Sequence, residues 1–174
     1  MNSDTERKEA LRKKSLGELG ELFGIKALVD NLFEKVVNLN DRKMNYPFAD
    51  LYAEKDGRKF IISIKARNKF QKNHTLNAYY NLGSRAYENA ATAEAEFEAE
   101  AHWMAVQFDA QRYSVYLGSL AELIHRHAIP IRECEQGKVG TCLVREKRHY
   151  FDFSFFENKK NCEFEVVETM PSSN

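Results

Sequence analysis

Residues 49–65, with the sequence ADLYAEKDGRKFIISIK, carry the strongest indication of the fold class. Two largely apolar runs flank the tetrapeptide KDGR, and Asp-Gly is a favoured dipeptide for a tight turn between antiparallel strands. The spacing therefore predicts a β-hairpin with strands at 49–54 and 59–65. Alternate residues of the second strand point to opposite faces, and both faces are partly apolar, so we expect a central strand covered by helices. One face of this strand carries Phe60, Ile62 and Ile64, and the other carries Ile61, Ser63 and Lys65.

Before the hairpin, apolar residues at helical spacing predict a helix from about residue 5 to the mid-twenties. Glycines weaken its middle, and a bend or break is expected before Val36, where a strand could begin. Ser119 and Glu122 form a capping-box pattern that predicts a short helix at 119–125. The other expected elements are a long helix at 75–101 and strands at 102–109, 112–117, 148–155 and 163–167. This order predicts a mixed α/β sheet flanked by helices.

Composition limits the class of protein. The chain has 174 residues, 43% hydrophobic and 30% charged, which is the size of one domain, with a polar tail from about residue 169. The mean hydropathy is −0.59, and neither a membrane-spanning run nor a secretory signal is apparent, so we expect a cytoplasmic protein. Three cysteines without CxxC spacing suggest neither a disulfide framework nor a zinc site.

Charge is unevenly distributed along a chain whose net charge is zero. Residues 58–87 carry 7 basic and no acidic side chains, whereas residues 1–57 carry 10 basic and 11 acidic ones. A locally positive surface of this kind favours a phosphate-containing partner, although many such runs are only solvated.

Glu18 is a candidate functional residue of the first helix. A helical projection places it in the middle of an apolar stripe formed by Leu11, Leu22, Ile25 and Val29. A buried carboxylate needs a cation or a metal ion as its partner. A structural ion pair with Lys65 or an arginine would meet the same need, and a helix broken at its glycines would move Glu18 out of the stripe.

The hairpin offers further polar groups. Asp50 begins the first strand, and Ser63 and Lys65 share one face near the end of the second. Asp50, Lys65 and Glu18 could converge on one divalent cation, because carboxylates hold Mg²⁺ while a lysine stabilises the charge that develops during phosphodiester hydrolysis. A salt bridge between Asp50 and Lys65 is the structural alternative.

The order Glu18, Asp50 and S63-I-K65 resembles that of the PD-(D/E)XK nucleases, especially the resolvase-like and restriction-endonuclease-like members. The resemblance covers about residues 5–117 and implies a restriction-endonuclease-like α/β fold. It also implies that Asp50, Glu18 and the backbone carbonyl of Ile64 bind the metal, and that Lys65 assists the attacking water.

Ser63 departs from this pattern, because it stands where the family has Asp or Glu. A neutral hydroxyl does not supply the negative charge that a hard cation prefers. Either Glu18, Glu21 or Glu54 takes its place in space, or the site has decayed and the protein only binds.

The basic run beyond Lys65 is the candidate nucleic-acid surface. Side chains that could contact phosphates, sugars or bases are Arg67, Asn68, Lys69, Gln71 and Lys72. The sequence thus predicts a single nuclease-like domain over residues 1–174, acting as a DNA endonuclease with Mg²⁺ or Mn²⁺. The alternatives are a catalytically inactive nucleic-acid-binding protein and a protein-interaction factor. We expect DNA but no membrane as a partner, with a monomer or a homodimer left open.

Overall fold

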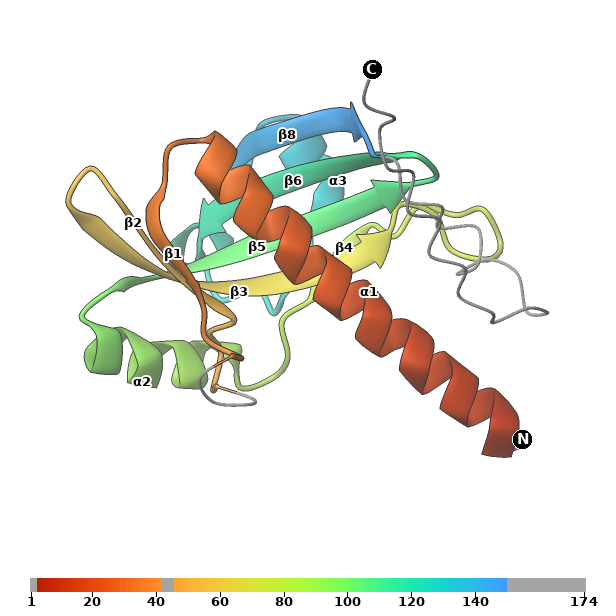
Figure 1. The fold of residues 1–174 in the computed structure, drawn as a ribbon, viewed down its shortest axis with the longest axis horizontal. Helices are drawn as coiled ribbons and strands as arrows, with labels where there is room; N and C mark the ends of the chain where they lie inside the picture. Colours follow the sequence, from red (N-terminus) through yellow and green to blue (C-terminus); the bar gives the residue numbers. More distant parts are fainter. Residues whose placement is uncertain (1–2, 42–45, 150–174) are drawn as a thin grey trace, which may run out of the picture.

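The computed structural model describes residues 3–41 and 46–149 (Figure 1). Its centre is a six-stranded sheet with the order β1-β2-β3-β5-β6-β8. The pair β3 and β5 is parallel, and the other neighbouring strands are antiparallel. The strands of this sheet are β1 (Glu34–Asn38), β2 (Leu51–Lys55), β3 (Arg58–Asn68), β5 (Glu100–Asp109), β6 (Arg112–Ser119) and β8 (Thr141–Arg148). The remaining elements are α1 (Ser3–Asp30), β4 (Tyr79–Asn81), α2 (Ala86–Phe97), the 3-10 helix η1 (Leu120–Leu123), β7 (Ala128–Pro130) and α3 (Ile131–Glu135).

Helices cover both faces of the sheet, as expected for a central β3. On one face, α1 packs over Ile62 and Ile64 of β3 and over Met104 of β5. On the other face, Ala90 and Ala93 of α2 pack in the same cluster as Ile61 and Trp103. The alternation of side chains in β3 is therefore as predicted, and Ser63 and Lys65 lie on the α2 side.

The predicted hairpin is confirmed. β2 and β3 pair in register from Leu51 with Ile62 to Lys55 with Arg58. Asp56 and Gly57 form the turn with φ values of 51° and 76°, both in the left-handed region that Asp-Gly turns require. The capping box of Ser119 and Glu122 is also present, although it caps a 3-10 helix of 4 residues.

The break expected before Val36 is confirmed, because α1 ends at Asp30 and β1 begins at Glu34. The first helix differs from the prediction in two ways. It continues past the mid-twenties to Asp30, and the face that packs on the sheet is not the predicted stripe. Leu11, Leu22 and Val29 are 58%, 53% and 54% exposed. The sheet instead contacts a face of α1 that contains small residues, because small side chains let the helix approach the strands closely. The buried residues of this face are Leu16, Gly20, Phe23, Gly24, Ala27 and Leu28.

Substitution of two glycines of α1 by alanine should have opposite effects on stability. A Cβ atom at Gly20 would lie 2.4 Å from the Cβ of Ala66, whereas one at Gly17 would have nothing within 4 Å. Gly20→Ala should destabilise the fold by about 1–3 kcal/mol through overpacking. Gly17→Ala should stabilise it by up to about 1 kcal/mol through helix propensity. Urea unfolding of both variants checks this, and a shift of both midpoints in the same direction would contradict the packing shown.

Other elements are shorter or later than predicted. The long helix expected at 75–101 is restricted to Ala86–Phe97, since β4 pairs with β7 and Gly83 takes a positive φ of 97° before the helix. The elements β7, α3 and β8 were not predicted. The strand expected at 148–155 lies outside the described residues except at its first two positions, and the strand at 163–167 and the polar tail lie wholly outside them.

Candidate active site

Asp50 lies immediately before β2, between the end of β1 and the middle of β3. Its backbone N–H donates to the carbonyl of Ile62 at 2.9 Å, and its carbonyl accepts from the N–H of Leu39 at 2.9 Å. Its Oδ2 accepts from the backbone N–H of Ile64 at 2.6 Å. The side chain thus satisfies a backbone donor of β3 beside the start of β2.

Burial raises the pKa of Asp50. The backbone hydrogen bond from Ile64, the charge of Lys65 and hydrogen bonds from Asn40 and Ser63 act in the opposite direction. Loss of hydration outweighs them, so an ionised Asp50 lacks full compensation from the protein.

Glu21 of α1 reaches the same place from the helix side. Its Oε2 accepts from Nδ2 of Asn38 at 2.9 Å, and its Oε1 accepts from Nδ2 of Asn40 at 3.0 Å. Burial raises the pKa of Glu21, and the negative charges of Asp50 and Glu18 raise it further, against the two amide hydrogen bonds. Because Asn40 bonds with both Glu21 and Asp50, it links the two carboxylates.

Ser63 and Lys65 approach Asp50 from β3. Ser63 is only 3% exposed, and its hydroxyl hydrogen-bonds with the Asp50 carboxylate. Lys65 is half-buried, and its charge acts on the same carboxylate. The structure therefore brings Asp50, Ser63 and Lys65 together, as their positions in the hairpin suggested.

The expected burial of Glu18 is wrong. Its side chain is 64% exposed and forms an ion pair with Lys14 at 3.8 Å, because the predicted stripe is the outer face of α1. Glu54 is also away from Asp50. It lies four residues along β2, about 13 Å at the rise of a strand, and bonds to Lys35 at 2.7 Å and Tyr52 at 2.6 Å. Of the three glutamates considered as substitutes for the missing acid, the structure places Glu21 at the site.

Neither a protein-family model nor a curated protein matches the sequence. The structure is similar to that of Hjc, a Holliday junction resolvase from the archaeal hyperthermophile Archaeoglobus fulgidus. The TM-score is 0.51 and the sequence identity 17%, over 72% of this chain and 90% of Hjc. This chain has a restriction-endonuclease-like fold. The mixed sheet with flanking helices predicted from the sequence is thereby confirmed.

Resolvase-type nucleases typically use divalent metals, and such an ion needs oxygen donors from the protein. Within residues 3–41 and 46–149, no group of three or more His, Cys, Asp or Glu side chains is arranged to hold a metal. Mg²⁺ is commonly bound by only one or two carboxylates, with water and substrate phosphate completing its coordination. Asp50 and Glu21 supply two such carboxylates, and burial raises the pKa of each. A cation bound by both would stabilise their ionised forms.

The basic run beyond Lys65 continues from the site along β3 and into the loop before β4. Arg67, Gln71 and Lys72 are exposed, and Asn68 is half-buried. Lys69 differs, because it lies 3.7 Å from Asp109 and 3.5 Å from Glu146 and is largely buried. A phosphate would have to compete with both carboxylates for Lys69, which makes Lys69 a weaker contact than the sequence suggested.

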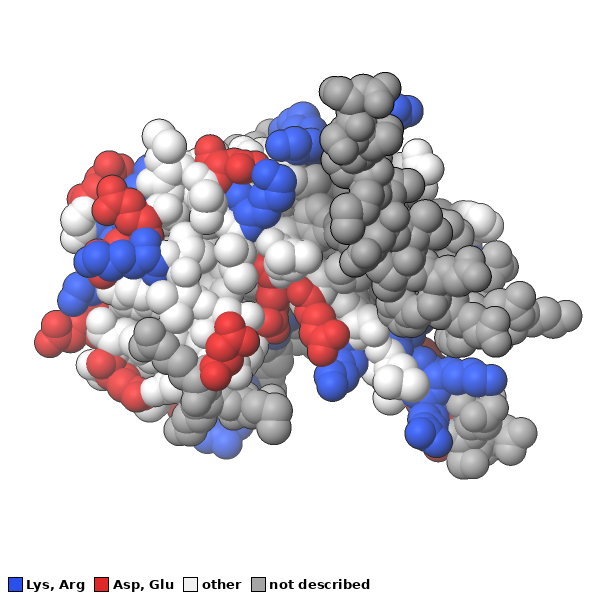
Figure 2. All heavy atoms as spheres, viewed as in Figure 1, with Lys and Arg blue, Asp and Glu red and all other residues white. Residues whose placement is uncertain are grey.

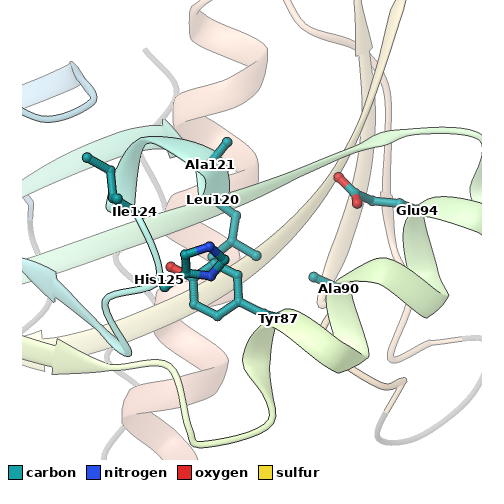
Figure 3. A pocket seen from close by; sticks show the side chains of 7 residues that line it. All are labelled: Tyr87, Ala90, Glu94, Leu120, Ala121, Ile124 and His125. Carbon is teal, nitrogen blue, oxygen red and sulfur yellow. The ribbon is translucent and has the colours of Figure 1, made fainter.

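A surface pocket lies elsewhere, between α2 and η1 (Figure 3). Its lining consists of Tyr87, Ala90, Glu94, Leu120, Ala121, Ile124 and His125. None of these residues belongs to the Asp50 site. Tyr87 packs against the rings of His125 and His127.

Asn38 and Asn40 are site residues that the sequence analysis missed. They flank the buried Leu39 at the end of β1, so both project to the same side of the chain. The polar-apolar-polar pattern NLN was a visible signal. It gained meaning only from the pairing of β1 with β2, which places this segment beside Asp50.

No helix within the described part of the chain is both long and apolar enough to cross a membrane.

Proposed function

We propose that this chain is a metal-dependent DNA endonuclease that hydrolyses phosphodiester bonds beside the β2–β3 hairpin. The observation that carries the proposal is the pair of carboxylates, Asp50 and Glu21, joined through Asn40 and faced by Lys65. The restriction-endonuclease-like fold supports it. Because Hjc is a resolvase of Holliday junctions, branched DNA is included among the proposed substrates.

Asp50 and Glu21 would hold Mg²⁺ or Mn²⁺, with the backbone carbonyl of Ile64 as a further ligand on the pattern of the nucleases that the sequence resembles. When bound, the cation polarises the phosphate and lowers the pKa of a water molecule. Lys65 would donate a hydrogen bond to the attacking water or to the phosphoryl oxygen that gains charge.

Asn40 and Ser63 are positioning residues in this mechanism. Asn40 links Glu21 and Asp50, and Ser63 hydrogen-bonds with Asp50 from β3. These bonds fix the separation and orientation of the two carboxylates before substrate arrives, which reduces the reorganisation needed during the reaction.

The primary test uses the purified protein with labelled linear duplex DNA, a four-way DNA junction and single-stranded RNA. We expect cleavage of DNA in Mg²⁺ or Mn²⁺ and none in EDTA. Failure to cut any substrate with either metal would remove the nuclease function. DNA binding without cleavage would establish the second candidate, a nuclease-fold protein that only binds DNA.

The neutral Ser63 favours the DNA-binding protein without cleavage, because the nucleases that the sequence resembles carry an acidic residue at this position. Ser63→Glu places a further carboxylate beside Asp50 at a buried position, and Ser63→Gln adds a similar volume without the charge. We expect the glutamate variant to melt at a lower temperature than the glutamine variant in EDTA, through like-charge repulsion. Mn²⁺ should reduce this difference in melting temperature between the two variants. A difference that is the same with and without Mn²⁺ would contradict a metal site here.

A further inference from the structure

The first part of α1 forms a basic arm, defined here as residues 5–16. It carries Arg7, Lys8, Arg12, Lys13 and Lys14 against only Glu6 and Glu9. The helix extends past the edge of the sheet, and basic side chains lie along this extension (Figures 1 and 2). This cluster lies outside the basic run that follows Lys65.

Two of these cations lie in line with the candidate active site. At 100° per residue, Lys14 is about 20° and Arg7 about 40° from Glu21 around the helix axis. At 1.5 Å per residue, they lie about 10 Å and 21 Å from Glu21 along the axis. Arg12 and Lys8 lie on the opposite side, about 180° and 140° from Glu21. The same arm therefore has one flank in line with the site and one turned away from it.

Both cations of the aligned flank are available on the surface. Arg7 is exposed, and the side chain of Lys14 is 75% exposed. The 3.8 Å ion pair of Lys14 with Glu18 is solvent-exposed, and such pairs contribute little. Lys14 can therefore exchange Glu18 for a phosphate at small cost.

We propose that the flank of Arg7 and Lys14 binds the phosphate backbone of a DNA duplex that extends from the cleavage site along α1. This inference rests on the proposed function and adds a partner surface to it. One strand of B-DNA has one phosphate per about 3.4 Å of axis. Measured along the duplex axis, Lys14 thus lies about three base-pair steps, and Arg7 about six, from the carboxylate site. Duplex DNA is favoured over an acidic protein because the track of cations begins where the phosphodiester is proposed to bind.

The test compares two double variants of the full-length protein that remove the same charges. Arg7→Ala with Lys14→Ala changes the aligned flank, and Lys8→Ala with Arg12→Ala changes the opposite flank. Affinity for a 30-base-pair duplex is measured by fluorescence anisotropy in EDTA over a range of salt concentrations. Circular dichroism verifies that both variants keep their helix content.

We expect the aligned variant to reduce the log-log salt slope by about 1.8, since each lost phosphate contact removes about 0.9. The opposite-flank variant should change the slope by less than about 0.5, because that flank is turned away from the duplex. Equal slopes for the two variants, or no DNA binding by the wild type, would overturn the proposal.

Cleavage by the same proteins in Mg²⁺ separates this proposal from the proposed function. If the wild type binds DNA through the aligned flank but cleaves no DNA, the nuclease function is contradicted and the DNA-binding flank is supported. If the wild type cleaves DNA and the aligned variant keeps the same salt dependence, the nuclease function is supported and the DNA-binding flank is contradicted.

Discussion

Asp50→Asn should abolish metal-dependent cleavage, with a loss of at least about 10³-fold. A bound metal contributes several kcal/mol to transition-state stabilisation, and each 1.36 kcal/mol corresponds to a factor of ten. Asn keeps an oxygen that can accept from the N–H of Ile64, so the end of the hairpin is retained. The rate of duplex cleavage under single-turnover conditions measures the effect.

The stability of Asp50→Asn distinguishes a catalytic loss from unfolding. The folded-state pKa of Asp50 is raised, so the ionised carboxylate lowers stability as pH rises from its ordinary pKa through the folded value. At neutral pH without metal, the uncharged Asn removes this cost. We therefore expect an unfolding midpoint in urea at least equal to that of the wild type.

Glu54→Gln is the matched control for Asp50→Asn. Glu54 is a carboxylate of β2, close to the turn of the hairpin, and it accepts hydrogen bonds from Lys35 and Tyr52. Its replacement should leave cleavage within about twofold of the wild type, because Glu54 lies about 13 Å from Asp50 along β2 and does not contact the site. An equal loss in both variants would show that the effect comes from the hairpin as a whole rather than from Asp50.

Glu21→Gln is expected to reduce cleavage by about 10²-fold or more, again through loss of metal-dependent stabilisation. Glu18→Gln should remain close to the wild type. The two residues lie on the same helix within one turn, but Glu21 bonds with Asn38 and Asn40 whereas Glu18 is exposed and pairs with Lys14. Calorimetric titration with Mn²⁺ gives a second readout, in which only Glu21→Gln weakens binding.

A large loss in Glu18→Gln with little change in Glu21→Gln would contradict the site described here. It would restore the assignment that the sequence suggested and would require α1 to rotate about its axis in the DNA complex. Equal losses in both variants would indicate that the helix supplies two carboxylates to the metal.

Much of the central sheet follows from local sequence. The Asp-Gly turn and the alternating residues of β3 specify the hairpin, because the turn conformation and the period of two are local properties. The strands β5 and β6 and the capping box of Ser119 were recognisable for the same reason. Asp50, Ser63 and Lys65 were found because the register of that hairpin also sets their relative positions.

The glutamate of the site depended on long-range packing. α1 has apolar residues on more than one face, and its sequence alone favoured the face with the larger side chains. The sheet selected the other face, since Gly20 and Gly24 allow contacts with Ala66, Ile64 and Met104 that a larger residue would prevent. That choice turns Glu18 to solvent and brings Glu21 to Asn38 and Asn40.

Turn chemistry and alternation within one strand are local, so they specify the hairpin, the central position of β3 and three residues of the candidate site. Contacts across the fold specify the other features. The orientation of α1, the partners of Glu21 and the shorter α2 depend on which surfaces meet across the fold. Contacts between segments distant in sequence are set by shape complementarity, and no local periodicity contains that information.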